Sequence, residues 1–317
     1  MMTLKPKMQE TMNDHRLPRG VQVIERGWLS ANMVVSTGRH NSAVIDSGYC
    51  THSDQTLALT KAALNGESLD ILLNTHLHSD HCGGNAALQA FYPDLQTFIP
   101  PGHASCVANW DPVLLSHQST GQLCPQFSFQ GLLSPGSEIL LGDNSWQVHA
   151  AAGHDPHSVI LFEPVSKCLI SADALWENGF GVVFPELDGD DAFDEVSITL
   201  DLIENLNPRT VVPGHGRVFD YSESILSRSR QRLEAFISNP TKHARHAVKV
   251  LLKFKLLEVR QQNFSEFLAW ALETPYFDRV RVRFFASIPL AKWVHDITLE
   301  LVNTGSARFD GSDIINT

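Results

Sequence analysis

The sequence has no run of 18 consecutive apolar residues, so a membrane-spanning helix is not expected. Its first twenty residues are polar, with scattered Lys, Pro and Arg, and they lack the apolar core of a secretory signal. We therefore expect a cytoplasmic protein that makes no membrane contact. The 317 residues are enough for one large domain, or for one domain with a smaller second one.

Cysteine is also scarce, with five scattered residues and no Cys-x-x-Cys pair. An odd number of dispersed cysteines does not indicate a disulfide framework, and their spacing does not indicate a thiolate zinc site. Both observations agree with a cytoplasmic location.

Positive charge is in deficit, with 24 Lys and Arg against 35 Asp and Glu and a net charge of −11. This balance argues against non-specific binding of nucleic acid by the whole surface. The deficit is uneven, because residues 241–293 hold ten Lys or Arg against four Asp or Glu. Within this stretch Lys242, Arg245, Lys249 and Lys253 recur at helical spacing and should share one helix face. Such a basic stripe is either a solvated helix face or a surface that contacts phosphates.

The densest group of ionisable side chains lies in residues 75–81, Thr-His-Leu-His-Ser-Asp-His, with four metal-capable side chains in six residues. The apolar run at 71–73 predicts a buried strand before it, and the Cys-Gly-Gly sequence at 82–84 predicts a turn into a helix after it. The group should therefore lie on a loop just past a strand end, where side chains can converge. Neutral imidazoles and a carboxylate at this density favour Zn²⁺ or a similar divalent ion.

This segment resembles the Thr-His-x-His-x-Asp-His motif of the metallo-β-lactamase-fold hydrolases. Members of that family also carry a Gly-His pair, then a single Asp, then a second Gly-His pair. The chain supplies these in order as Gly153-His154, Asp173 and Gly214-His215. The resemblance covers residues from about 21 to 219 and implies an α/β fold, namely an αββα sandwich of two mixed sheets followed by a small, mainly helical C-terminal domain.

The resemblance also implies a site for two divalent ions, with Zn²⁺ as the expected metal and Fe or Mn as alternatives. By position, the first ion would be held by His76, His78 and His154, the second by Asp80, His81 and His215, and Asp173 would bridge them. Every ligand position of the family is filled by a competent residue, which implies a catalytic member. A water between two such ions becomes hydroxide-like at neutral pH, and the ions polarise the substrate oxygen.

Three further assignments concern residues in or near these motifs. We assign Asp80 a catalytic role in addition to its role as a ligand. His157 is an extra histidine, which either donates to an oxyanion or leaving group, and is then catalytic, or packs within its loop. Asp46 ends an expected strand, and it either lies beside the metal site or only forms a turn before Gly48.

Short apolar runs separated by turn residues predict two series of strands. The expected strands are 21–24, 32–35, 42–45, 70–75 and 96–99 in the first series, and 139–141, 146–150, 159–162, 168–171 and 210–212 in the second. Helices are expected at 53–64, 83–91 and 192–206. Residues 102–124 should form a helix and a long loop at the substrate mouth, where His103 and His117 are interpreted as surface or packing residues.

After residue 219 the pattern changes to helices, with a break at Asn239-Pro240. They are expected at 221–237, 242–259, 265–272 and 290–302. We therefore divide the chain into a flexible tail (1–20), a catalytic domain (21–238) and a helical C-terminal domain (239–317). The last domain resembles the winged-helix-like appendage of some family members, and the alternative is a helical cap over the active-site mouth.

The substrate is less well defined by the sequence. Residues 172–181 resemble an element of glyoxalase II, but Phe180 stands where that family has Cys, Val182 stands where it has Arg, and no basic glutathione clamp is evident. Residues 183–187, residues 213–216 and the basic C-terminal stretch resemble β-lactamase-like hydrolases that include single-strand endoribonucleases. Cleavage of β-lactams is not favoured, because the motif has no thiolate ligand position.

Two functions therefore stay open. The first is metal-dependent hydrolysis of a small-molecule ester, thioester or lactone, and the second is phosphodiester cleavage of single-stranded RNA. A ligand-sensing protein that kept its metals is the non-enzymatic alternative. The overall charge favours the first function and the basic stripe favours the second. We take the first as our hypothesis and leave a homodimer open.

Overall fold

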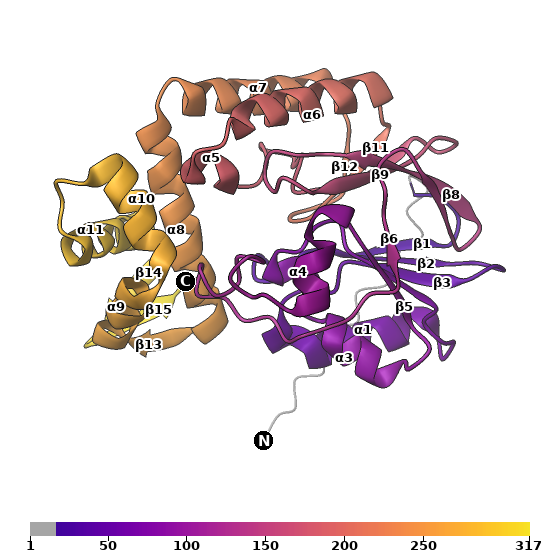
Figure 1. The fold of residues 1–317 in the computed structure, drawn as a ribbon, viewed down its shortest axis with the longest axis horizontal. Helices are drawn as coiled ribbons and strands as arrows, with labels where there is room; N and C mark the ends of the chain where they lie inside the picture. The colour runs from indigo at the N-terminus through magenta and orange to yellow at the C-terminus, as the bar shows by residue number, and fades with distance from the viewer. Residues whose placement is uncertain (1–16) are drawn as a thin grey trace.

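The computed structural model describes residues 17–317, which form two six-stranded sheets, one three-stranded sheet and the helices around them (Figure 1). Of the tail expected at 1–20, residues 1–16 lie outside the described residues. The remainder contacts the body of the protein. The carbonyl of Pro18 accepts a hydrogen bond from the amide of Val21, and the carbonyl of Arg19 accepts one from the Asn144 side chain.

The first sheet has the strand order β1-β2-β3-β4-β5-β6. Its strands are β1 (Val21–Ile24), β2 (Met33–Thr37), β3 (Ser42–Ile45), β4 (Ile71–Leu73), β5 (Gln96–Ile99) and β6 (Gly131–Leu132). The pairs β1–β2 and β2–β3 are antiparallel and the others are parallel, so the sheet is mixed. Helices α1 (Ser53–Leu64) and α3 (Asn85–Phe91) cover its outer face.

The second sheet has the order β12-β11-β10-β9-β8-β7. Its strands are β7 (Glu138–Leu141), β8 (Asn144–Ala150), β9 (Val159–Glu163), β10 (Cys168–Ala172), β11 (Thr210–Pro213) and β12 (Phe219–Asp220). It is also mixed, because β10 and β11 are parallel whereas the other pairs are antiparallel. Helices α6 (Ala192–Leu206) and α7 (Glu223–Ile237) cover its outer face.

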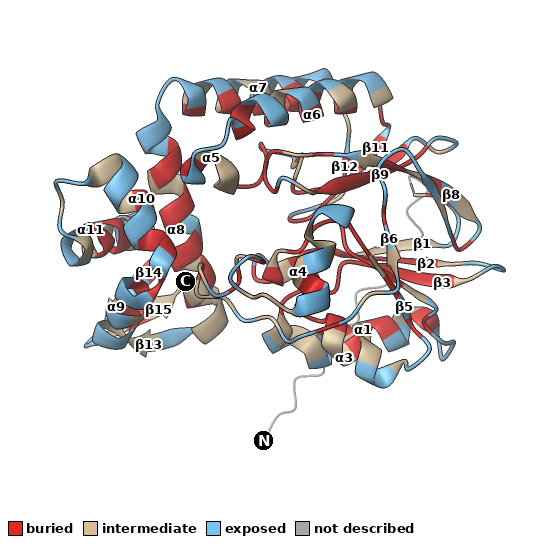
Figure 2. Cartoon of the chain, viewed as in Figure 1, coloured by how far each residue is buried: buried red, intermediate tan, exposed pale blue. Residues whose placement is uncertain are grey.

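The two sheets pack face to face, and the alternation of side chains along each strand explains why. In β4, Leu73 points into the core between the sheets, while Leu72 packs under α1 and α3. The inner core joins Leu73 and Ile45 of the first sheet to Trp146 and Leu161 of the second. Buried residues accordingly follow the strands, and exposed ones follow the outer helix faces (Figure 2). This is the predicted αββα sandwich, and the fold prediction is confirmed.

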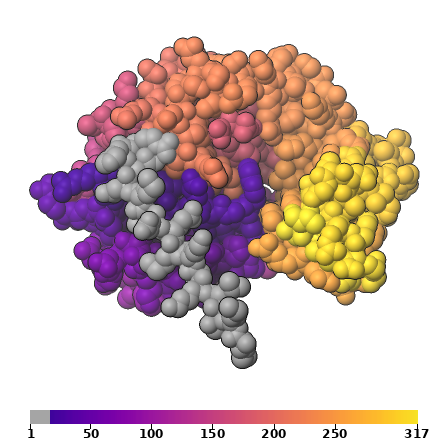
Figure 3. Space-filling view, turned by 180° about the vertical axis from the view of Figure 1, so that it is seen from behind, coloured from indigo at the N-terminus to yellow at the C-terminus, as the bar shows by residue number. Residues whose placement is uncertain are grey.

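The C-terminal region combines four helices with a small antiparallel sheet of order β13-β15-β14. Its elements are α8 (Pro240–Val259), β13 (Gln261–Asn263), α9 (Phe264–Glu273), α10 (Pro275–Phe285), α11 (Leu290–Asn303), β14 (Ala307–Asp310) and β15 (Asp313–Asn316). They enclose a core of their own around Leu252, Phe267, Phe277 and Trp293. Viewed from behind, this region lies at one side of the sandwich (Figure 3).

Two features of this region were not predicted. The small sheet escaped notice because β13 is polar and pairs with β15, which follows more than fifty residues later. Helix α10 was missed because its sequence mixes Arg, Val and Phe without clear spacing, although Tyr276, Phe277 and Val280 are buried.

The described residues also contain several short helices. They are η1 (Cys50–His52), α2 (Ser79–Cys82), η2 (Pro101–His103), α4 (Ala104–Asn109) and α5 (Phe184–Asp188). The expected helix at 83–91 begins at Asn85 and is preceded by the separate α2. No helix within residues 17–317 has the length and apolar character needed to cross a membrane.

Candidate metal centre

The residues of the predicted ligand set all lie at or just past the carboxyl ends of strands. His76 and His78 follow β4, Asp80 and His81 lie in α2, His154 follows β8, Asp173 follows β10, and His215 follows β11. Because β10 and β11 are parallel neighbours, their carboxyl ends meet at the same edge of the second sheet. The structure brings the seven side chains together at this edge, in groups whose ligand atoms lie within 4.8 Å of one another.

His76, His78 and His154 form the first cluster. Nε2 of His76 lies 3.1 Å from Nδ1 of His78, and that atom lies 2.8 Å from Nε2 of His154. Two nitrogens bound to one tetrahedral zinc at about 2.0 Å lie about 3.3 Å apart. The spacing of the three imidazoles is therefore close to the spacing that a shared ion requires.

Asp80, His81 and His215 form the second cluster. Nε2 of His215 lies 3.1 Å from Oδ2 of Asp80. Nε2 of His81 is buried and has no hydrogen-bond partner among the described residues. A buried polar atom left without a partner costs about 1–3 kcal/mol, so this nitrogen fits a ligand that the protein itself does not supply.

Asp173 lies between the two clusters. Its Oδ2 is 3.3 Å from Nε2 of His154, and its Oδ1 is 3.6 Å from Nε2 of His81. Nε1 of Trp176 donates a hydrogen bond of 3.2 Å to Oδ1. The preceding residue, Ala172, has a φ of 45°, and the register between β10 and β11 shifts at this point. This irregular strand end turns the carboxylate toward both clusters.

Two glycines let the backbone approach the site closely. A Cβ added at Gly181 would lie 2.4 Å from Nδ1 of His154, and one added at Gly214 would lie 2.2 Å from Oδ1 of Asp173. Neither contact is sterically allowed. Gly214, the glycine of the second Gly-His pair, is therefore needed because a side chain there would clash with the carboxylate of Asp173.

Asp46 orients His81 from the side away from Asp173. Its Oδ2 lies 2.8 Å from Nδ1 of His81, and its carboxylate accepts hydrogen bonds of 2.9 and 2.8 Å from the amide and the hydroxyl of Thr75. Of the two alternatives for Asp46, this contact favours the position beside the clusters over a turn alone. A carboxylate in this position fixes the ring and its tautomer, which leaves the other nitrogen available to a metal.

Burial sets the charge state of two histidines of the first cluster. It lowers the pKa of His76 and lowers the pKa of His78 to about 3, so both rings are neutral at neutral pH. Burial alone would raise the pKa of Asp80, but the hydrogen bond from His215 and the charge of His81 lower it. Neutral His76 and His78, ionised carboxylates and the unpartnered Nε2 of His81 are a donor set for divalent ions, so the residues present fit a two-ion site.

A cavity of about 720 Å³ opens over the clusters. One side is formed by residues 110–124, which we call the wall segment and which contribute Leu114 and Thr120. The C-terminal region also lines the cavity, through Leu251 and Phe254 of α8 and Tyr276 of α10. Residues 102–124, the expected wall of the substrate mouth, thus border this cavity.

His157 lies outside the residues that line this cavity and outside the clusters. Its ring lies edge-on to His103 at 4.5 Å between centroids, and it packs so closely on Gly102 that an added Cβ would lie 2.1 Å from its Cγ. His103 lines the cavity, whereas His117 is buried and its Nε2 donates to the carbonyl of Leu77. The contacts of His157 are those of a packed loop residue.

Other cavity residues had no signal in the sequence. The Trp28 ring stacks on His215 with centroids 5.4 Å apart, and the Trp176 ring meets His215 edge-on at 5.7 Å. Arg232 of α7 donates a 2.8 Å hydrogen bond to Nε2 of His246 of α8, and both line the cavity. Only the tertiary fold brings these residues to the site.

Two sheets with helices outside, and His and Asp clusters on the loops at one edge, define the class of metallo-hydrolase folds. The sequence model of the Metallo-beta-lactamase superfamily matches residues 26–215, and the chain belongs to this family. The recognition made from the motifs is confirmed.

Individual relatives agree with this membership. Hydroxyacylglutathione hydrolase of Thermosynechococcus vestitus is 26% identical over 192 residues, which cover 60% of this chain and 63% of that enzyme. The match thus spans less than two thirds of the relative's length. Among solved structures, a metallo-beta-lactamase family protein of Thermus thermophilus has a TM-score of 0.54 at 16% identity and covers 94% of this chain and 99% of its own. TTHA1623, solved in a di-iron-bound form, has a TM-score of 0.52 at 25% identity and covers 67% and 98%.

Proposed function

We propose that this protein is a hydrolase that uses two divalent ions to cleave an ester or thioester bond of a small molecule. One observation carries the proposal. The two oxygens of Asp173 face separate clusters, one toward His154 and the other toward His81, and both clusters open into a single cavity. Bound ions would supply an activated water and polarise the substrate oxygen.

The protein's own residues prepare the site for this chemistry. His76, His78 and His154 would hold one ion, Asp80, His81 and His215 the other, and Asp173 would bridge them. Asp46 fixes the ring of His81, and the carbonyl of Val182 accepts a 2.6 Å hydrogen bond from Nδ1 of His154. Asp80 ends in the cavity, where it would also contact the reacting group. His157 has no part in proton transfer under this proposal.

The lining of the cavity supports an organic acyl substrate. Phe254, Leu251 and Val250 of α8 line it together with Trp28 and Phe184, so an apolar group can be buried beside the clusters. The relative from Thermosynechococcus vestitus is named for the hydrolysis of an acylated glutathione, which supports an acyl substrate. A glutathione thioester is not favoured, because neither of the two residues that differ from the glyoxalase II element could bind glutathione. Phe180 is buried in the core, and Val182 has no charge with which to bind a carboxylate.

The basic stripe supports the acyl substrate over RNA, because three of its four cationic side chains are already held by contacts within the C-terminal region. Arg245 and Lys249 both bind Glu300 of α11. Nζ of Lys253 donates hydrogen bonds of 2.6 and 3.0 Å to the backbone oxygens of Ser306 and Thr317. These contacts connect α8 to the rest of the C-terminal region. They favour a role of the stripe in packing over a role in binding phosphates.

We also propose that residues 239–317 form a winged-helix-like domain that closes one side of the cavity. Its element order, with a strand after the first helix and a hairpin after the last, agrees with such a domain. The contribution of α8 and α10 to the cavity lining agrees with a lid. Zn²⁺ remains the metal we propose, and iron is the alternative because TTHA1623 was solved with two irons.

The test is a parallel assay of p-nitrophenyl esters, acyl thioesters, a homoserine lactone and single-stranded RNA, with metal-loaded protein at two salt concentrations. We expect acyl hydrolysis that requires metal, about two ions per chain at the His and Asp clusters, and little dependence on salt. Lys242→Glu removes an exposed charge of the stripe, and Lys167→Glu at the turn before β10 is its matched control. RNA cleavage that falls with salt and with Lys242→Glu only, without acyl hydrolysis, would establish the nuclease instead.

A further inference from the structure

A second group of metal-ligating side chains lies outside the His and Asp clusters. Cys82 ends α2 and is fully buried, while His117 and Cys124 belong to the wall segment. Their ligand atoms lie within 4.8 Å of one another. Cys82 and Cys124 are 42 residues apart, so their spacing in the sequence gave no sign of the group.

The distance between the sulfurs fits coordination and not a disulfide. Sγ of Cys82 and Sγ of Cys124 are 3.7 Å apart. Two thiolates bound to one tetrahedral zinc at about 2.3 Å lie about 3.8 Å apart. Bonded disulfide sulfurs lie about 2.05 Å apart. The two cysteines therefore stand at the separation that a tetrahedral ion would impose.

His117 is oriented as metal-binding histidines are. Its Nε2 donates a 2.9 Å hydrogen bond to the carbonyl of Leu77, which assigns the ring proton to that nitrogen. Its Nδ1 is buried and has no hydrogen-bond partner among the described residues, and the residue is only 2% exposed. A ring held by a carbonyl on one nitrogen, with the other free, is the usual arrangement beside a metal.

The charge state of Cys124 agrees with this geometry. The hydrogen bond with Cys82 and the contact with His117 lower the pKa of Cys124 against the effect of burial, whereas burial and the same contact raise the pKa of Cys82. The thiolate is the form that binds metal. Two sulfurs and an imidazole are a soft donor set, which selects Zn²⁺ over Mg²⁺ or Ca²⁺.

We propose that Cys82, His117 and Cys124 form a separate structural site for a soft divalent cation of the Zn²⁺ class, with water as the fourth ligand. Cys124 is partly exposed, which leaves room for that water. The ion would join α2, which carries Asp80 and His81, to the wall segment that borders the cavity. The site is independent of the proposed reaction, because none of its ligands belongs to the His and Asp clusters.

Hydrogen bonds also connect the wall segment to α2 and to the nearby Tyr49. The Ser79 hydroxyl donates a 2.5 Å hydrogen bond to Oε1 of Gln122, and the Tyr49 hydroxyl accepts one of 3.0 Å from the amide of Leu123. A bond from the ion to His117 and Cys124 would fix residues on both sides of Thr120, which lines the cavity. Zinc at this site should therefore slow proteolysis within residues 110–124.

Cobalt substitution tests the proposal directly. Thiolate-bound Co²⁺ has charge-transfer bands in the near ultraviolet, whereas Co²⁺ held by His and Asp has none, so the spectrum reports this site alone. We expect the bands in the wild-type protein and in Cys106→Ser, whose cysteine lies on α4 outside the group, and their loss in Cys124→Ser. Absence of the bands in the wild type, or their persistence in Cys124→Ser, overturns the proposal.

A measurement on the unmodified protein removes any dependence on how the variants fold. Zn²⁺ should protect Cys124, the partly exposed thiol of the group, from alkylation, and mass mapping should identify it among the five thiols. Under a mild peroxide, Cys82 and Cys124 should form a disulfide only after Zn²⁺ is removed. Alkylation or disulfide formation at the same rate with and without Zn²⁺ would show a simple thiol pair and would refute the metal site.

Discussion

Oδ2 of Asp46 lies 2.8 Å from Nδ1 of His81, and both side chains are buried. This contact joins the end of β3 to the short helix α2, so the first sheet positions a residue of the second cluster. Asp46 reaches it with a φ of 59°, a left-handed conformation that Asp tolerates better than most residues. The carboxylate also raises the pKa of His81, since together with Asp173 it outweighs the effect of burial.

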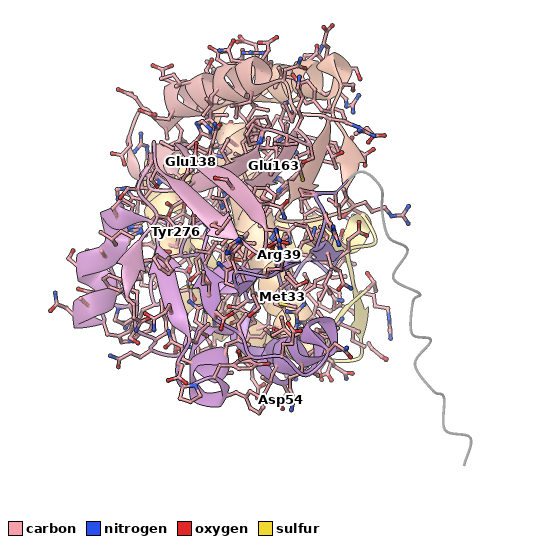
Figure 4. All side chains as sticks on the ribbon, turned by 90° about the vertical axis from the view of Figure 1, so that its right-hand side faces the viewer. Met33, Arg39, Asp54, Glu138, Glu163 and Tyr276 are labelled. Carbon is pink, nitrogen blue, oxygen red and sulfur yellow. The ribbon has the colours of Figure 1, made fainter. Side chains whose placement is uncertain are left out.

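Asp46→Asn should weaken metal binding while leaving the fold intact. Asn also tolerates a positive φ, but it brings no negative charge to His81. Loss of such an orienting group typically costs 10–100-fold in metal affinity, and we expect an effect of that order, measured by competition with a chelator. Asp54→Asn is the control, because Asp54 lies on the outer helix α1 and is exposed (Figure 4). Equal affinity in Asp46→Asn and wild type would show that the contact has no influence on the site.

Asp173→Ala should lose activity far more than stability. The carboxylate touches His81, His154 and Trp176 and takes no part in a hydrophobic core, so its removal leaves the sandwich packed. We expect a fall in kcat/KM of at least about 100-fold with a small change in melting temperature. Asp94→Ala, in an exposed turn before β5, serves as the control. Near-normal turnover in Asp173→Ala would mean that this residue does not serve the reaction.

The parts of the structure that the sequence predicted are those with local signals. The apolar runs predicted five of the six strands of each sheet, because each run alternates between two buried faces, as Leu72 and Leu73 do. The two-residue strands β6 and β12 were too short to give such a signal. The His-x-His-x-Asp-His segment also gave a local signal, because its residues are close both in sequence and in space.

The parts that escaped prediction depend on contacts between distant segments. Cys82 meets Cys124 only because the wall segment folds back over α2, and Arg232 meets His246 only because α7 and α8 pack together. His157 shows the converse. It stands three residues from His154, yet its ring turns away to pack on His103, because proximity in sequence does not fix the direction of a loop side chain.

Gly181→Ala should damage the site by displacing one ring. The new Cβ would lie 2.4 Å from Nδ1 of His154, whose partner is the carbonyl of Val182. A shift of about 1 Å in such a group can cost on the order of 100-fold in rate, so we expect a fall of roughly that size in kcat/KM. Gly27→Ala is the matched control, because an added Cβ there meets nothing within 4 Å. Equal activity of the two variants would indicate that His154 tolerates displacement.

His243→Gln should make the protein more resistant to acid. His243 is fully buried between Phe193 and Phe236, its Nε2 accepts a hydrogen bond from the amide of Val183, and burial lowers its pKa to about 3. In the unfolded chain the pKa is near the ordinary value of about 6.5, so below that pH the unfolded state binds a proton that the folded state does not. The contribution of neutral His243 to the free energy of unfolding is therefore complete above about pH 6.5, and it is lost as the pH falls toward 3.

Between pH 7 and pH 5 this single group should remove about 2 kcal/mol from the free energy of unfolding. Gln keeps an acceptor for the Val183 amide but does not titrate, so the variant should lose about 2 kcal/mol less than wild type over the same interval. Urea unfolding at the two pH values measures the difference, and His40→Gln, at an exposed turn, should retain the wild-type dependence. If His243→Gln and wild type lose stability in parallel, His243 takes up a proton within the folded protein, and its surroundings must open to water in acid.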